Sequence, residues 1–208
     1  MVKPRYPLMF MLLVVSIMVI YYWSRPLQPE QANYYPAGRD INPFTLVDED
    51  GEPFTEANLH GHWTFLFLGY TYCPDICPTT LADLRAVYPE LKQIAPRSQV
   101  VFVSADPKRD DSARLKGYVD FFQPEFKAVT AQHDHLFPFV RNLGLVYSIV
   151  EHDSKDYLID HSASIVLISP AGKLVAVFRP QAQEGQVPHV SMATMVSDFT
   201  RIVRLAGE

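Results

Sequence analysis

Two cysteines stand four positions apart in the segment TYCPDICP, and a proline follows each of them. Cys73 and Cys77 are the only cysteines of the 208-residue chain. Two sulfurs at this spacing can form a disulfide, exchange electrons with the thiols of a partner, or bind a metal ion. The pair by itself is compatible with all three chemistries, so the surrounding sequence must discriminate between them.

The small loop between the cysteines argues against a purely structural disulfide. A bridge between Cys73 and Cys77 would constrain little of the unfolded chain. Thioredoxin-type oxidoreductases place two residues between their cysteines, whereas three stand between these. The wider spacing suits two sulfurs that face one ion, and it leaves redox chemistry on a partner open. Because Cys77 opens a predicted helix, we expect the helix N-terminus to lower its pKa and favour the thiolate.

A metal bound by two thiolates needs another ligand from a distant part of the sequence. Among the seven histidines, His161 is the best placed, because it directly precedes a buried apolar strand predicted for residues 164–168. From this position His161 could be either a metal ligand or a hydrogen-bonded residue at the rim of the core. Two thiolates and one imidazole would make a soft site of low coordination number, which fits Cu(I) best. In extended backbone Asp160 points to the opposite side, so we interpret it as a supporting or surface residue.

The elements that must position these residues alternate between strand and helix. Continuous apolar runs at residues 63–71 and 100–106 predict two buried strands, and the cysteines lie between the first strand and the helix after it. Pro89 should kink or break that helix near its end. The other predicted elements are a hairpin at 44–55, a helix from 110 or 111 to 121, a strand at 126–130, a helix at 134–143, short strands at 147–151 and 157–160, a hairpin at 164–178 and a helix at 187–205.

This order of elements predicts an α/β fold with a thioredoxin-like central mixed sheet flanked by helices. We assign this domain to residues 41–208, after a linker at residues 26–40 that is rich in proline and polar residues. The last predicted hairpin turns at Ser-Pro-Ala-Gly, which suits a type I turn.

Residues 1–25 are interpreted as a single transmembrane anchor. The run from Tyr6 to Trp23 contains no charge, and its 18 residues approach the about 20 that a spanning helix needs. Lys3 and Arg5 precede the run and favour a cytoplasmic N-terminus. A cleaved signal peptide would need small residues at its end, whereas this run ends in bulky aromatic residues. We therefore expect a single-pass protein of a bacterial inner membrane, with the domain facing the periplasm.

The charge of the chain is acidic outside this N-terminal segment. The sequence holds 18 basic and 23 acidic residues, and Lys3, Arg5 and Arg25 are the only charged residues before Glu30. An acidic domain repels phosphate groups, so a nucleic-acid partner is not expected.

Taken together, three motifs resemble the Sco/SenC family of copper-binding, membrane-anchored, thioredoxin-like proteins. They are GYTYCPDICP at residues 69–78, SADPKRD at 104–110 and YLIDHS at 157–162. The resemblance covers about residues 38–205 and the anchor. It implies a copper ion, Cu(I) or also Cu(II), that is bound by Cys73, Cys77 and His161. Asp106 would then lie in a turn near the site. A turn at the end of a strand that caps the next helix would also explain an aspartate at this position.

The resemblance also implies a metallochaperone, not an enzyme. Such a protein would deliver copper to, or reduce the cysteines of, the dinuclear copper site of cytochrome c oxidase during assembly. Its partner would be the copper-site subunit of the oxidase or another copper or thiol protein. A membrane-anchored thiol-disulfide oxidoreductase is the main alternative, and a peroxidase-like use of Cys73 is a third.

Overall fold

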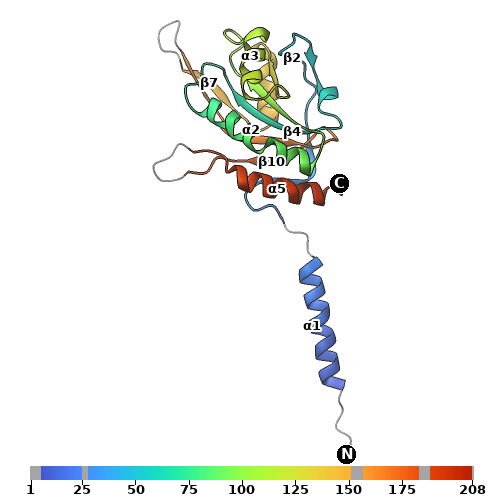
Figure 1. Cartoon of the computed structure of the whole chain (residues 1–208). Coiled ribbons are helices and arrows are strands. Elements are labelled where there is room, and N and C mark those ends of the chain that lie inside the picture. The colour runs from blue at the N-terminus through green and yellow to red at the C-terminus, as the bar shows by residue number, and fades with distance from the viewer. Residues whose placement is uncertain (1–5, 25–27, 151–156, 183–187, 208) are drawn as a thin grey trace, which may run out of the picture.

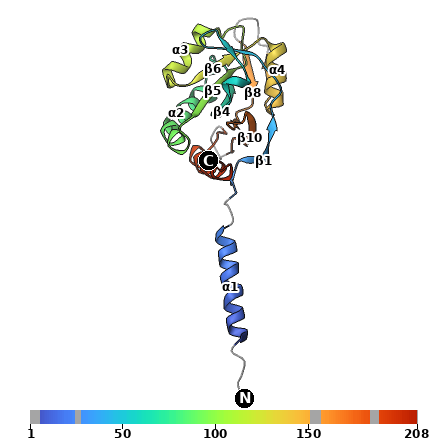
Figure 2. The same ribbon diagram turned by 90° about the vertical axis from the view of Figure 1, so that its right-hand side faces the viewer.

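The structure is a computed structural model that describes residues 6–24, 28–150, 157–182 and 188–207. A helix, α1 (Tyr6–Ser24), lies apart from a folded domain in which helices cover a central sheet (Figures 1 and 2). The domain strands are β1 (Asn33–Asp40), β2 (Leu46–Asp48), β3 (Pro53–Phe54), β4 (Trp63–Gly69), β5 (Ser98–Ser104), β6 (Lys127–Thr130), β7 (Tyr147–Val150), β8 (Leu158–His161), β9 (Ile165–Ile168) and β10 (Lys173–Phe178). The domain helices are α2 (Ile76–Ile94), α3 (Ser112–Phe122), α4 (His133–Asn142) and α5 (Met192–Leu205), with a short 3-10 turn, η1 (Glu56–Asn58).

Eight of the strands form one mixed sheet in the order β1-β10-β9-β4-β5-β6-β2-β3. The central strands β4, β5 and β6 run parallel, and β9 joins β4 in antiparallel orientation. In Figure 2, α2 and α3 lie on one side of this sheet and α4 lies on the other. Every residue of β4 is buried, as expected for a strand covered on both faces. The predicted mixed sheet flanked by helices is therefore confirmed.

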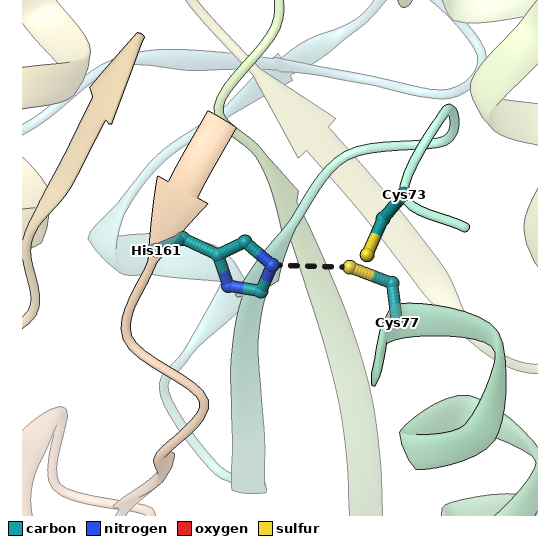
Figure 3. A group of neighbouring side chains, drawn as sticks. All are labelled: Cys73, Cys77 and His161. Carbon is teal, nitrogen blue, oxygen red and sulfur yellow. Dashed lines mark hydrogen bonds between the residues drawn. The ribbon is translucent and has the colours of Figure 1, made fainter. Parts of the chain in front are cut away.

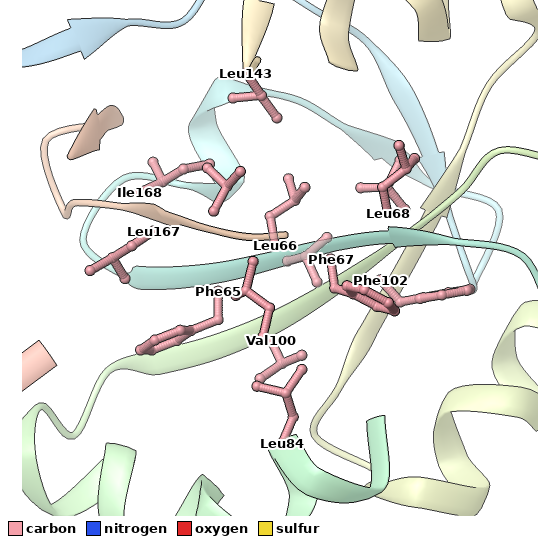
Figure 4. Packing of buried hydrophobic residues seen from close by; sticks show 14 of the residues in the cluster. Phe65, Leu66, Phe67, Leu68, Leu84, Val100, Phe102, Leu143, Leu167 and Ile168 are labelled. Atoms are coloured by element: carbon pink, nitrogen blue, oxygen red, sulfur yellow. The ribbon is translucent and has the colours of Figure 1, made fainter. Parts of the chain in front are cut away.

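Aromatic side chains of β4 and β5 fill the core on one face of the sheet, because Phe65 and Phe67 are two positions apart and Phe67 lies opposite Phe102. Phe65, Phe67 and Phe102 are fully buried (Figure 4). The ring of Phe65 packs edge-on against Phe199 of α5, with 4.9 Å between the ring centroids. Burial of each such side chain contributes about 1.5–3 kcal/mol relative to exposure. The strand that ends just before the cysteines is thus among the most firmly held elements of the domain.

The helix after the cysteines continues past Pro89, which was expected to kink or break it. Helix α2 extends five residues beyond this proline, to Ile94. Pro89 lacks an N–H group, so the carbonyl of Arg85 has no partner in the helical ladder. Both residues are exposed, and water can satisfy that carbonyl. The helix therefore tolerates the proline on its solvent face.

The sheet begins earlier in the chain than the composition indicated. Residues 33–40, which were assigned to the linker, form β1 and pair antiparallel with β10 at the edge of the sheet. The preceding residues are also tied to the domain, because the buried carboxylate of Asp198 accepts hydrogen bonds from the backbone N–H groups of residues 30–32 at 2.7–2.9 Å. Proline and polar residues are compatible with an edge strand, so composition did not reveal this pairing.

The last helix starts later than predicted. Ser191 caps α5 by accepting a hydrogen bond from the backbone N–H of Thr194, and the helix begins at Met192 instead of near residue 187. Residues 183–187, which include the predicted start, lie outside the described residues.

The N-terminal helix does not confirm the transmembrane anchor predicted for residues 1–25. Helix α1 covers 19 residues. Within the described part of the chain, no helix combines the length and the apolar character that a membrane crossing requires.

Candidate metal centre

The two cysteines lie where the central strand β4 gives way to helix α2. Cys73 is half-buried in the connecting loop, where its backbone N–H donates to the carbonyl of Tyr70 at 3.2 Å. Cys77 is the second residue of α2, and its side chain is fully buried. The first turn of a helix leaves N–H groups without helical partners, so this loop places both sulfurs beside free donors.

Gly69, the last residue of β4, makes room for the inner sulfur. A Cβ atom at this position would lie 2.6 Å from the Sγ atom of Cys77 and 2.7 Å from Cε2 of Phe102. Real Cβ contacts are not this short, so only glycine fits between the sulfur and the aromatic ring. The requirement is spatial, because the backbone here has no positive φ. Gly69 opens the GYTYCPDICP motif, but no local pattern in the sequence explains why a glycine is required there.

His161 comes from a separate two-stranded sheet formed by β7 and β8. It is the last residue of β8 and lies opposite Tyr147 in β7. The backbone N–H of Ser162 donates to the carbonyl of Val146 at 2.9 Å and extends this pairing. The imidazole packs edge-on against the rings of Phe67 and Tyr70, at centroid distances of 6.1 and 5.9 Å. The histidine is therefore held on one side by its hairpin and on the other by the end of the core.

The imidazole and the two sulfurs meet in space although 84 positions separate Cys77 from His161. The Nε2 atom of His161 lies 3.3 Å from Sγ of Cys77 (Figure 3). The ligand atoms of Cys73, Cys77 and His161 all lie within 4.8 Å of one another. The structure thus brings together the three residues proposed as ligands. Among the described residues, no other histidine, cysteine or acidic residue belongs to this cluster.

The tautomer of His161 suits metal binding. Its Nδ1 atom lies 3.2 Å from the backbone carbonyl of Ser162. A carbonyl oxygen can only accept a hydrogen bond, so Nδ1 carries the hydrogen and the lone pair of Nε2 faces the sulfurs. Ligating histidines commonly have such a partner on the other ring nitrogen, which fixes the ring orientation.

The negative charge of the thiolate lies on Cys73, whereas it was predicted for Cys77. The hydrogen bond from the Cys77 thiol is the largest cause that lowers the pKa of Cys73 to about 4, and backbone N–H groups act in the same direction. Burial raises the pKa of the Cys77 thiol, and the neighbouring Cys73 raises it further. The helix N-terminus was expected to favour a thiolate at Cys77, but desolvation of this buried side chain outweighs it. The thiolate of the metal-free protein therefore resides on Cys73.

The donors fit a small soft ion. Metal–sulfur and metal–nitrogen bonds of roughly 2.3 and 2.0 Å add up to more than the 3.3 Å that separates Sγ from Nε2, so one ion can contact both atoms. Thiolates and imidazole favour copper in its reduced state, whereas zinc usually takes four ligands. Asp160 is exposed on β8, as predicted for a residue outside the ligand set.

The other histidines lie outside this cluster wherever the structure describes them. His60 and His62 interact with each other, because Nδ1 of His62 lies 3.1 Å from the carbonyl oxygen of His60. His133 bonds the hydroxyl of Tyr147 at 2.7 Å, and His135 is exposed. His152 lies outside the described residues.

Asp106 does more than the capping role favoured from sequence. Helix α3 is capped by Asp111, whose carboxylate accepts a hydrogen bond from the backbone N–H of Arg114 at 2.8 Å. The carboxylate of Asp106 is buried, pairs with Arg109 and accepts a 2.5 Å hydrogen bond from the hydroxyl of Tyr157. Sequence analysis missed this contact, because no local pattern links a tyrosine to an aspartate 51 positions away.

Comparison with known sequences agrees with this geometry. A family model described as SCO1/SenC matches residues 33–195, most of the chain. The chain belongs to the SCO1/SenC family. It is 36% identical over 148 residues to a putative copper-binding protein of Stutzerimonas stutzeri, covering 70% of this chain and 72% of that one. It is 37% identical over 137 residues to the mitochondrial protein SCO1 homolog 1 of Arabidopsis thaliana, covering 65% of this chain but 41% of the longer relative.

Solved structures of SCO1/SenC proteins share the fold. Arabidopsis thaliana ScoI with copper bound superposes with a TM-score of 0.68 at 31% identity, over 79% of this chain and 98% of that one. Yeast Sco1 with copper bound gives a TM-score of 0.65 at 30% identity, over 76% and 87% of the two chains. Copper-bound relatives at this level of similarity support the donor analysis.

Proposed function

We propose that this SCO1/SenC protein is a copper metallochaperone that binds Cu(I) through Cys73, Cys77 and His161. The observation that carries the proposal is the 3.3 Å approach of the His161 Nε2 atom to the Sγ atom of Cys77, beside the second sulfur. Two thiolates and one imidazole satisfy Cu(I), and Cu(II) is a second state that the same donors can reach. The copper is cargo, which the protein passes to a partner.

The unequal burial of the ligands supports delivery by ligand exchange. Cys73 and His161 are partly exposed, whereas Cys77 is fully buried. An incoming thiolate can therefore replace Cys73 first, while Cys77 retains the ion until a second partner ligand has bound. The copper keeps at least two protein ligands throughout. Both sulfurs must be reduced for binding, so a disulfide would release the ion.

The receiving partner follows from the family resemblance and the copper-bound relatives. We propose the copper-site subunit of cytochrome c oxidase, at its dinuclear copper site, with another copper or thiol protein as the alternative. We propose no nucleic-acid partner, because the domain has an excess of acidic residues, which repel phosphate groups.

Copper titration of the reduced protein tests the proposal. We expect one Cu(I) ion per chain, with two sulfur donors and one nitrogen donor in the X-ray absorption spectrum. His161→Ala should remove the nitrogen donor and lower Cu(I) affinity by more than about 100-fold, because a direct ligand contributes more than the 10- to 100-fold of an outer-shell partner. The exposed His135→Ala variant is the matched control and should bind as the wild type does. Binding with unchanged donors in His161→Ala would refute the copper site.

A thiol-disulfide reductase is a second candidate, supported by the half-exposed Cys73 and its lowered pKa of about 4. The Cys73 thiolate would attack a partner disulfide and release one partner thiolate. Cys77 would then lose its proton and displace the second partner sulfur, leaving two reduced partner thiols and a Cys73–Cys77 disulfide. His161→Ala should retain most of this activity but lose copper-dependent maturation of the oxidase, which separates the two functions.

We also propose that α1 associates the domain with a bacterial inner membrane, as a single N-terminal anchor with the domain on the periplasmic side. Its apolar side chains support this, since Met9, Phe10 and Leu12 are 58–69% exposed and need an apolar environment. Fractionation of cells that express the full chain and a variant lacking residues 1–25 tests it: the full chain should sediment with membranes and the shortened chain should not.

A further inference from the structure

Arg109 lies among three tyrosine rings at the edge of the candidate metal centre. Its guanidinium carbon is 3.6 Å from the ring centroid of Tyr157, 4.7 Å from that of Tyr72 and 5.8 Å from that of Tyr70. The Nε atom pairs with the carboxylate of Asp106. The Nη2 atom is buried and has no hydrogen-bond partner among the residues that the structure describes. The arginine is therefore held by ring faces and one carboxylate, an arrangement that a flexible lysine would not reproduce.

These tyrosines belong to the two chain segments that carry the ligands. Tyr70 and Tyr72 lie in the loop that leads to Cys73. Tyr157 stands immediately before β8, four residues ahead of His161 at the end of that strand. Its hydroxyl donates to Asp106 at 2.5 Å. The Arg109 side chain thus connects the loop of the cysteines with the strand of the histidine.

Such a connection is needed because β7 and β8 form a sheet of their own. They pair only with each other among the described strands, and an isolated two-stranded hairpin is marginally stable in water. Ile149 and Leu158 are exposed, whereas Tyr147 and Ile159 are buried against the domain. Contacts between the hairpin and the domain must therefore fix the place of His161.

We infer that Asp106, Arg109 and Tyr157 form a latch that positions His161 against the two sulfurs. The inference rests on the proposed copper-binding function and adds three positioning residues to it. When the latch is closed, Tyr157 holds the start of β8 against the turn after β5, and the imidazole at the other end of the strand faces Cys77. When the hydroxyl of Tyr157 is removed, the hairpin is released at one end and Nε2 spends less time within bonding reach of the ion.

Tyr157→Phe tests the latch with the smallest change, because it keeps the ring beside Arg109 and removes only the bond to Asp106. We expect Cu(I) affinity to fall about 10- to 100-fold, the range found for residues that orient metal ligands. Tyr88→Phe is the matched control, since it removes another tyrosine hydroxyl that bonds a carboxylate, that of Glu125 at 3.2 Å, and also lies 3.3 Å from the carbonyl of Ser98. It should leave copper affinity unchanged.

The same substitution in a His161→Ala background shows whether the latch acts through the histidine. If it does, Tyr157→Phe causes no further loss of Cu(I) affinity once His161 is gone, because the two sulfurs alone do not depend on the hairpin. An equal loss in both backgrounds would overturn the inference and indicate a general structural effect. Arg109→Lys should resemble Tyr157→Phe, whereas wild-type affinity in Arg109→Lys would show that only the positive charge matters and would also overturn it.

A metal-free measurement separates failure of the latch from failure of the proposed function. The N–H of Ser162 is bonded to Val146 at the end of the hairpin, so its amide hydrogen exchange reports whether that end is closed. Exchange at Ser162 should accelerate about tenfold or more in Tyr157→Phe and remain unchanged in Tyr88→Phe. If wild-type protein binds no Cu(I), the proposed function fails, yet this exchange experiment still decides the latch. Unchanged exchange and unchanged affinity in Tyr157→Phe contradict it.

Discussion

The candidate metal centre joins two regions that are built in different ways. The cysteine arm, residues 69–78, continues a fully buried central strand into a helix, and its inner sulfur is packed against the core. The histidine arm, strands β7 and β8, is a two-stranded sheet with exposed apolar side chains and a few specific contacts to the domain. One arm is part of the most stable layer of the fold, and the other is attached to it.

This difference indicates how a metallochaperone can both retain and release an ion. A ligand that is fixed in the core, such as Cys77, gives a permanent point of attachment. Ligands that are partly exposed, such as Cys73 and His161, can be exchanged with those of a partner. Local opening is easiest where few buried contacts hold a segment, and in the hairpin only one face is held in this way: Tyr147 and Ile159 are buried, whereas Ile149 and Leu158 are exposed. Changes in the cysteine arm should therefore affect stability and binding together, and changes in the histidine arm should affect mainly binding.

The largest expected effect concerns the unequal ionisation of the two sulfurs. The pKa of Cys73 is lowered to about 4 from an ordinary value near 9, so its thiolate persists at mildly acidic pH and disappears only as the pH falls through about 4. Iodoacetamide should label Cys73 at pH 5–6, where an ordinary thiol is almost unreactive, and leave the buried Cys77 unlabelled. Mass spectrometry of peptides after labelling across pH 3–10 measures this. Half-maximal labelling of Cys73 near pH 9 would contradict the assignment of the thiolate.

Loss of the buried sulfur should be the most damaging substitution for copper binding. Cys77→Ser replaces a soft ligand with a hydroxyl, and we expect Cu(I) affinity to fall by more than about 100-fold, beyond the range for residues that only orient ligands. Competition with a chromophoric Cu(I) chelator measures this. Ser197→Ala, at an exposed position of helix α5, is the control and should bind Cu(I) as the wild type does. Retention of wild-type affinity in Cys77→Ser would remove Cys77 from the site.

Gly69→Ala tests whether the cysteine arm depends on core packing. The added Cβ atom would overlap Sγ of Cys77 and the ring of Phe102, and such overpacking costs about 1–3 kcal/mol. Chemical denaturation should show this loss, together with weaker Cu(I) binding. Gly117→Ala is the matched control, because nothing lies within 4 Å of its Cβ position in helix α3. It should stabilise the protein by about 0.5–1 kcal/mol. Equal stability of the two variants would show that Gly69 is not needed for close packing.

The two arms also differ in how far the sequence revealed them. The cysteine arm could be predicted almost completely, because an apolar run, a turn and an amphipathic helix follow one another within a short stretch. His161 could be placed at a strand end, but its approach to Cys77 depends on the order of strands in the sheet, which periodicity does not encode. The edge strand β1 and the contact of Tyr157 with Asp106 had no local signal at all. Desolvation of Cys77 was missed for the same reason, since burial is a property of the assembled core.

The smallest expected effect concerns the far end of the histidine arm. The hydroxyl of Ser162 accepts a hydrogen bond from the backbone N–H of Val146 at 3.0 Å, in a partly exposed position. Ser162→Ala removes this bond and the 3.2 Å bond that the hydroxyl donates to the carbonyl of Val146, but it keeps the backbone carbonyl that orients Nδ1 of His161. Water can replace the hydroxyl at exposed Val146, so the two bonds together should contribute about 0.5–1 kcal/mol and Cu(I) affinity should fall only about two- to fivefold. The free energy of unfolding of the domain should change little, because the hairpin lies outside the main sheet. The contradicting result would be that Ser162→Ala destabilises the domain as strongly as Gly69→Ala does. That result would show that the histidine arm is as firmly integrated in the core as the cysteine arm. Ligand exchange at the exposed end of the histidine arm would then have no structural basis.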